Sequence, residues 1–77
     1  MIISKTNGSF RIEQSEVYTK CKPHFAVVLA HSQASGMWAT WETGGPNDFF
    51  FGHYFETERE ARMDYHERLL TYYKYHD

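Results

Sequence analysis

The sequence predicts a single α+β domain over residues 1–77, an antiparallel sheet of four to five strands with one C-terminal helix packed on one face. Residues 49–55, FFFGHYF, have the aromatic content of a strand and lead into residues 57–60, TERE, a capping box that begins a helix. Residues 25–31, FAVVLAH, would place apolar side chains on both faces of a strand. This pattern is typical of a central strand that is covered on both faces.

The N-terminal part predicts a β-hairpin over residues 2–14. Asn7-Gly8 is a strong hairpin signal because both residues tolerate a positive φ. Residues 9–13 alternate apolar and charged side chains, the period of a half-buried strand. Residues 15–24 are polar and predict a loop, in which Val17 and Tyr18 could form a short extended piece. The alternative is a frayed N-terminus in which only the second strand of the hairpin forms.

Three further strands are expected to form a meander after this hairpin. They cover residues 25–31, 37–43 and 49–55, and the segments between them are rich in Gly, Ser, Asn and Pro. Alternation along the second of them places Trp38 and Trp41 on opposite faces of the sheet.

A helix is expected from about Glu58 to about Tyr75. The capping box predicts its first turn, and Glu58 and Arg62 form an i,i+4 pair. Four residues at spacings i, i+4, i+8 and i+11 predict the stripe that faces the sheet: Ala61, Tyr65, Leu69 and Tyr72.

Composition limits the function classes. The net charge is −2, with eight Lys and Arg against ten Asp and Glu, which argues against a phosphate-binding surface. Cys21 is the single cysteine, so no internal disulfide is possible and a reducing compartment is expected. The N-terminus lacks the apolar run of a signal peptide, and no stretch of 18 apolar residues predicts a membrane span. The expected location is the cytoplasm.

The residues with chemical potential are few. Cys21 and His24 have the spacing of half a zinc site, but no second pair completes it, so a free thiol and a loop histidine are the preferred interpretation. Cys21 between Lys20 and Lys22 could instead serve as an activated thiol in a small Cys/His enzyme. No nucleophile, metalloprotease or phosphate-loop motif is present. We therefore expect no enzyme activity, no catalytic residue, no metal and no cofactor.

An aromatic sheet face could also stack the bases of single-stranded nucleic acid. The residues expected on the helix-free face are Trp38, Phe49, Phe51 and Phe55. Lys5, Lys20 and Lys22 would have to gather at one edge to attract the phosphates. Because the chain as a whole is slightly acidic, nucleic acid is a possible partner but not the favoured one.

The aromatic content exceeds what one helix can cover. The second face of the sheet must be solvated, folded over or paired with another chain, and a bare aromatic face is rare in monomers. Either the sheet curls and the N-terminal hairpin covers these rings, or they form a surface for another protein or for self-association. The residues predicted for such a protein-binding surface are Trp38, Trp41, Phe49, Phe51 and Tyr54.

Two motifs in the second half of the chain resemble those of a known class of proteins. W-x-x-W-E covers 38–42 and G-H-Y-F-x-T-x-x-E-A covers 52–61. Together they resemble small accessory proteins of phages and bacterial mobile elements, anti-CRISPR proteins among them. The resemblance implies an inhibitor that binds a host protein and blocks it sterically. It brings no catalytic residue, because the matched positions are a strand kink, a helix cap and a helix–sheet contact.

Overall fold

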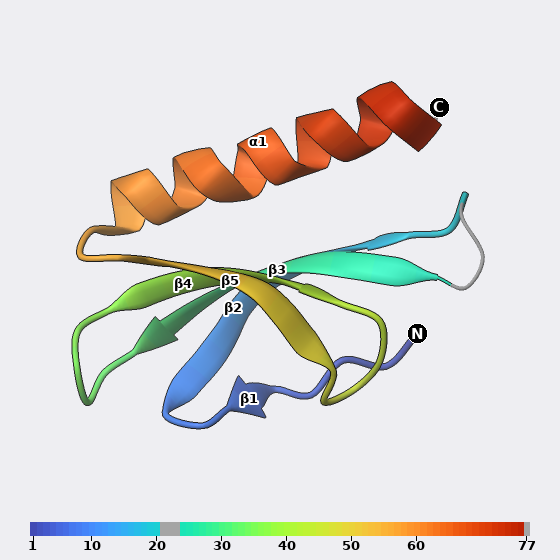
Figure 1. Ribbon diagram of the computed structural model, residues 1–77. Coiled ribbons are helices and arrows are strands. Elements are labelled where there is room, and N and C mark those ends of the chain that lie inside the picture. The colour runs from blue at the N-terminus through green and yellow to red at the C-terminus, as the bar shows by residue number, and fades with distance from the viewer. Residues whose placement is uncertain (21–23, 77) are drawn as a thin grey trace.

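The computed structural model describes residues 1–20 and 24–76, and these form five strands and one helix (Figure 1). The elements in chain order are β1 (Thr6–Asn7), β2 (Phe10–Tyr18), β3 (Phe25–Ser32), β4 (Trp38–Thr43), β5 (Phe49–Phe55) and α1 (Glu58–His76). The strands make one antiparallel sheet in the order β1-β2-β3-β4-β5, and α1 lies across one face. The predicted α+β architecture is confirmed.

The N-terminal hairpin is shorter than predicted, and its turn is displaced by one residue. Asn7 pairs with Phe10, so the two turn residues are Gly8 and Ser9. Gly8 has φ 61°, as the first central residue of a type II′ turn requires. The residues before β1 form no strand. The Ser4 N–H donates to the Pro46 carbonyl at 2.9 Å, so the start of the chain reaches the loop between β4 and β5.

Strand β2 runs to Tyr18, so the predicted loop was wrong for residues 15 and 16, and the extended piece at Val17 and Tyr18 is the end of this strand. Residues 21–23 of the predicted loop lie outside the described part. A bulge places Glu13 as an extra residue between Ile12 and Gln14, which pair with successive residues of β3. One extra residue reverses the alternation of side chains. Ile12 therefore packs on the helix-free side, whereas Tyr18 packs under α1.

The helix-side cluster lies between α1 and the sheet. Its buried members are Tyr18, Val27, Leu29, Ala61, Tyr65 and Leu69. Tyr72 packs against them, so the predicted stripe of α1 is confirmed. The Tyr18 hydroxyl also donates to the Leu69 carbonyl at 2.7 Å, which ties the end of β2 to the helix.

The first turn of α1 has the expected cap. The Glu60 N–H donates to Thr57 Oγ1 at 3.3 Å, and the Thr57 hydroxyl donates to Glu60 Oε1 at 2.8 Å. The Glu60 carboxylate thus accepts from the cap side chain, where the usual capping box would have it accept from the cap N–H. Arg62 Nε lies 2.6 Å from Glu58 Oε2, as the i,i+4 spacing predicts.

The sheet curls away from α1 (Figure 1). Its helix-free side carries a second cluster of buried residues. Phe10 of β2 lies with its ring centroid 5.2 Å from that of Trp41 and 6.0 Å from that of Tyr54 on β5. Strands β2 and β5 are three positions apart in the sheet, which would separate them by about 14 Å if the sheet were flat. Curling brings them together and leaves Trp41 only 4% exposed. Ile3 from the N-terminal segment also packs on this cluster.

A second bulge interrupts the pairing of β5 with β4. Thr40 pairs with His53 and Glu42 with Phe50, so two residues of β5 stand opposite Trp41 alone. These two are Phe51, with φ 53°, and Gly52.

This bulge reverses the alternation of side chains along β5 and puts Phe55 on the helix side, beside its pair Trp38. The expectation that Trp38 and Phe55 lie on the helix-free face was therefore wrong. It was also wrong for Phe51, whose ring lies against Phe50 on the helix side. Phe49, before the bulge, does lie on that face.

Gly52 is required by close packing, and its substitution by Ala should destabilise the fold. A Cβ at this position would lie 2.6 Å from Trp41 Nε1 and 2.9 Å from Trp41 Cδ1. Because Trp41 is enclosed, we expect Gly52→Ala to lower the free energy of unfolding by about 1–3 kcal/mol in urea denaturation. Gly45→Ala is the control, since its Cβ would meet nothing closer than 3.8 Å. Equal midpoints for the two variants would contradict the packing argument.

Candidate functional site

The outer strand β5 is the most exposed edge of the sheet. It has β4 as its one neighbour, and residues 51–54 are exposed in succession. It contains no Asp, Glu, Lys, Arg or Pro, the residues that usually protect an edge from pairing with another chain. On the opposite edge, β1 covers the start of β2, and β2 carries Arg11, Glu13 and Glu16. We call β5, residues 49–55, the open edge.

The structure separates the five residues predicted for protein binding. Phe51 is 69% exposed and Tyr54 is 56% exposed, both on the open edge, and Phe49 is half-buried against Trp41. Trp41 is enclosed by the curl of the sheet. Trp38 is half-buried on the helix side and stacks on His31 with ring centroids 4.2 Å apart. The three β5 residues thus share one edge, whereas the two tryptophans of β4 belong to the packing of the core.

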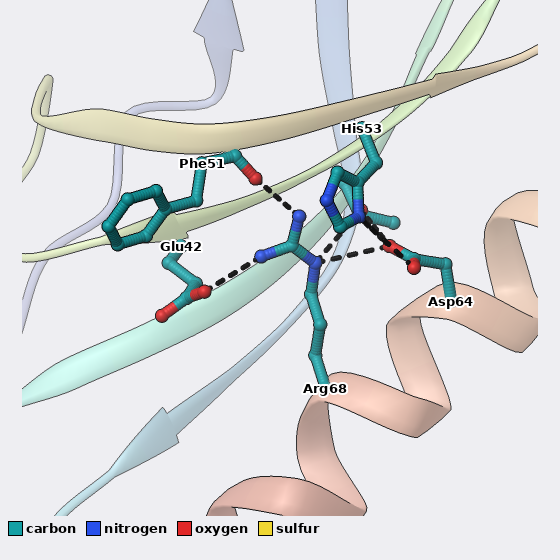
Figure 2. Close-up of polar contacts among 6 residues, drawn as sticks. Glu42, Phe51, His53, Asp64 and Arg68 are labelled. Carbon is teal, nitrogen blue, oxygen red and sulfur yellow. Dashed lines mark hydrogen bonds and ion pairs between the residues drawn. The ribbon is translucent and has the colours of Figure 1, made fainter.

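A buried guanidinium joins α1 to the sheet beside this edge. The Arg68 side chain, 9% exposed, extends from the helix towards β4 and β5 (Figure 2). Its Nη1 donates to Glu42 Oε2 at 2.8 Å and its Nε donates to Asp64 Oδ2 at 3.1 Å. Its Nη2 donates to the carbonyl of Phe51, the residue with positive φ.

Asp64 connects the same group to two further side chains. The Thr40 hydroxyl donates to Asp64 Oδ2 at 2.5 Å, and His53 Nδ1 lies 3.0 and 3.1 Å from the two carboxylate oxygens. Burial alone would raise the pKa of this carboxyl. The hydrogen bonds from its three side-chain partners and the guanidinium charge outweigh burial and hold the pKa of Asp64 below its ordinary value. We call this set the Arg68 network: Thr40, Glu42, His53, Asp64 and Arg68.

The Arg68 network positions the open edge. A bulky residue with positive φ is strained by about 1–3 kcal/mol, so Phe51 needs surrounding contacts to hold it there. The guanidinium supplies such a contact at its carbonyl, and His53 adds a second link from β5 to the helix. The i,i+4 spacing of Asp64 and Arg68 was a readable signal of this ion pair. The parts played by Glu42 and His53 depend on the register of β4 and β5, which the sequence alone did not reveal.

A hollow of about 630 Å³ opens between α1 and the sheet next to this network. Its lining comprises Val27, Glu42, His53, Asp64, Glu67, Arg68, Leu70, Thr71 and Tyr72. His53 therefore belongs both to the open edge and to the hollow. The lining contains three carboxylates and one guanidinium.

The other predicted residues do not gather into a site. Lys5 lies beside Ile12, to which its carbonyl is hydrogen-bonded, whereas Lys20 follows the far end of β2. Roughly 20 Å of strand separates these two positions. Lys22 and Cys21 lie outside the described residues, and His24 is exposed. Among the residues that the structure describes, no group of three or more His, Cys, Asp or Glu is placed to hold a metal ion.

Comparisons with protein-family models, curated proteins and solved structures found no match to this chain. Within residues 1–20 and 24–76, no helix has the length and apolar composition that a bilayer crossing requires.

Acid should weaken the fold through Asp64. Because its folded-state pKa is lowered, this carboxylate contributes stability above its unfolded-state pKa of about 3.9, and the contribution is lost as pH falls through the folded value. We expect Asp64→Asn to lower the free energy of unfolding by about 1–3 kcal/mol near neutral pH. Urea denaturation from pH 6 to pH 2.5 should show the gap between wild type and variant closing with acid. Parallel curves over that range would contradict the assignment.

Proposed function

We propose that this chain is a non-enzymatic protein-binding module that docks an extended segment of its partner along the open edge. The observation that carries the proposal is the edge itself, a seven-residue outer strand without a charged side chain and with four successive exposed residues. Outside the bulge at Phe51 and Gly52, backbone N–H and C=O groups on such an edge can pair with a further strand. Affinity then comes from the main-chain bonds, and specificity from the side chains beside them.

Two exposed rings would provide the anchoring contacts on either side of an added strand. The Phe51 ring lies against Phe50, which pairs with Glu42 and so belongs to the helix side. Tyr54 lies on the other side, where its hydroxyl accepts from Trp41 Nε1 at 3.3 Å. Because core contacts already hold this strand, docking would cost less ordering entropy than docking on a mobile loop.

A steric inhibitor is the form of this function that the sequence resemblance supports. A module that occupies a host protein's strand or loop excludes the ligand that normally binds there, and it needs no catalytic group. The resemblance to phage and mobile-element accessory proteins points to such a host target. The alternative of nucleic-acid binding loses support from Lys5 and Lys20, which stand at opposite ends of β2.

The proposal is tested by selecting binding peptides from a random 12-residue display library and mapping the best binder by amide chemical shifts. We expect the largest shifts in β5. Phe51→Ala should weaken binding about tenfold or more, as loss of an aromatic anchor does. The matched control is Met63→Ala, which removes a side chain 61% exposed on the helix; it should change affinity less than about twofold.

Far-UV circular dichroism and urea midpoints should match wild type for both variants, since neither side chain is buried. Shifts that map away from β5, or equal affinities for the two variants, would contradict the proposal.

A further inference from the structure

We infer that the segment docking on the open edge is basic, and that one of its Lys or Arg side chains enters the hollow beside His53. This inference rests on the proposed function and specifies the chemistry of the partner. The juxtaposition that supports it is an uncharged edge strand next to a carboxylate-lined hollow, with one residue, His53, common to both.

The charged residues that directly flank β5 and those that line the hollow are mostly acidic. Asp48 precedes β5 and Glu56 follows it, while Glu42, Asp64 and Glu67 line the hollow. Arg68 is the opposing cation in this set, which leaves a formal charge of −4 where the whole chain carries −2. Electrostatic complementarity therefore favours a cationic partner, both in the rate of encounter and in the choice of segment.

Arg68 is in no position to accept an incoming anion. Its three guanidinium nitrogens already donate to Thr40, Asp64, Glu42 and the Phe51 carbonyl, and its side chain is almost completely buried. Glu67, by contrast, is exposed, and its carboxylate has no hydrogen bond or ion pair to the part of the chain that the structure describes. The hollow thus presents a carboxylate that is available to an ammonium or guanidinium group.

The shape of the hollow suits a long side chain with a charged end. Its volume of about 630 Å³ is larger than a single Lys or Arg side chain needs. Leu70 and Tyr72 supply apolar contacts for the methylene groups, which such side chains bury while the charge stays at a polar rim. In an added strand, alternate side chains point to the helix side, so a residue beside His53 would be directed at the hollow.

The same charges argue against two other occupants. A second copy that paired its own β5 here would bring two sets of carboxylates together, and like-charge contacts are unfavourable. A nucleic acid would bring phosphates to the same carboxylates. A basic extended segment is the occupant that the edge and the hollow both fit.

The test uses three fluorescein-labelled ten-residue peptides of alternating sequence, Val–Lys, Val–Ser and Val–Glu, and measures binding by fluorescence anisotropy in 50 mM salt. We expect the Val–Lys peptide to bind at least tenfold more tightly than Val–Ser, and Val–Glu to bind least. Raising the salt to 300 mM should narrow the difference, since exposed charges are screened. Amide shifts on the labelled protein should place the Val–Lys peptide on β5.

Two variants that lose the same charge distinguish binding in the hollow from general electrostatic attraction to the acidic protein. Glu67→Gln should lower the affinity for the Val–Lys peptide about three- to tenfold. Glu13→Gln, which removes one exposed carboxylate from β2, should change this affinity less than twofold. Neither substitution should affect the Val–Ser peptide.

Each contrary result has a distinct meaning. Equal binding of Val–Lys and Val–Ser to β5, or equal effects of the two glutamate substitutions, would overturn the basic-partner inference and leave the proposed function standing. Absence of β5 shifts with all three peptides and with the library binders would overturn both. A dimer in size-exclusion chromatography, with the β5 amides protected from hydrogen exchange, would show a second copy on the edge and overturn the inference.

Discussion

The contact between Arg68 and the bulge of β5 is the interaction on which the exposed side of this molecule depends. At that point the backbone of the outer strand leaves regular geometry, and Phe51 adopts a positive φ. The guanidinium, anchored to two carboxylates, holds the Phe51 carbonyl from the helix side. On the other face, Gly52 leaves just enough room for the Trp41 ring. The open edge is therefore a strand held from both sides.

Two bulges decide which side chains meet. The extra residue in β2 turns Tyr18 under the helix, and the extra residue in β5 turns His53 and Phe55 to the same side. Without the second bulge, His53 could not reach Asp64, and Tyr54 could not accept from Trp41. The pairing of β4 with β5 thus determines the Arg68 network, the hollow beside it and the arrangement of the open edge.

The aromatic surplus is divided between two cores and one edge. Curling of the sheet, together with Ile3 and Phe10, encloses Trp41 on the side that α1 does not cover. This accounts for a large part of the aromatic content without any partner. Among the residues whose exposure the structure describes, the exposed aromatic rings are those of Phe51 and Tyr54 on β5 and Tyr73 on α1, which is less than a whole sheet face.

The sequence by itself determined the local features of this protein: the helix from Glu58 with its Thr57 cap, the stripe that α1 turns to the sheet, and the central strand β3. These features depend on residues within a few positions of one another, so their sequence patterns can be recognised without knowledge of the tertiary structure. The strand over residues 49–55 was also predictable, because its aromatic residues favour a strand. The curl, both bulges and the Arg68 network were decided only by the tertiary structure. A bulge reverses the alternation on which a sequence pattern is read, and Glu42, His53 and Arg68 meet through pairings between residues far apart in the chain.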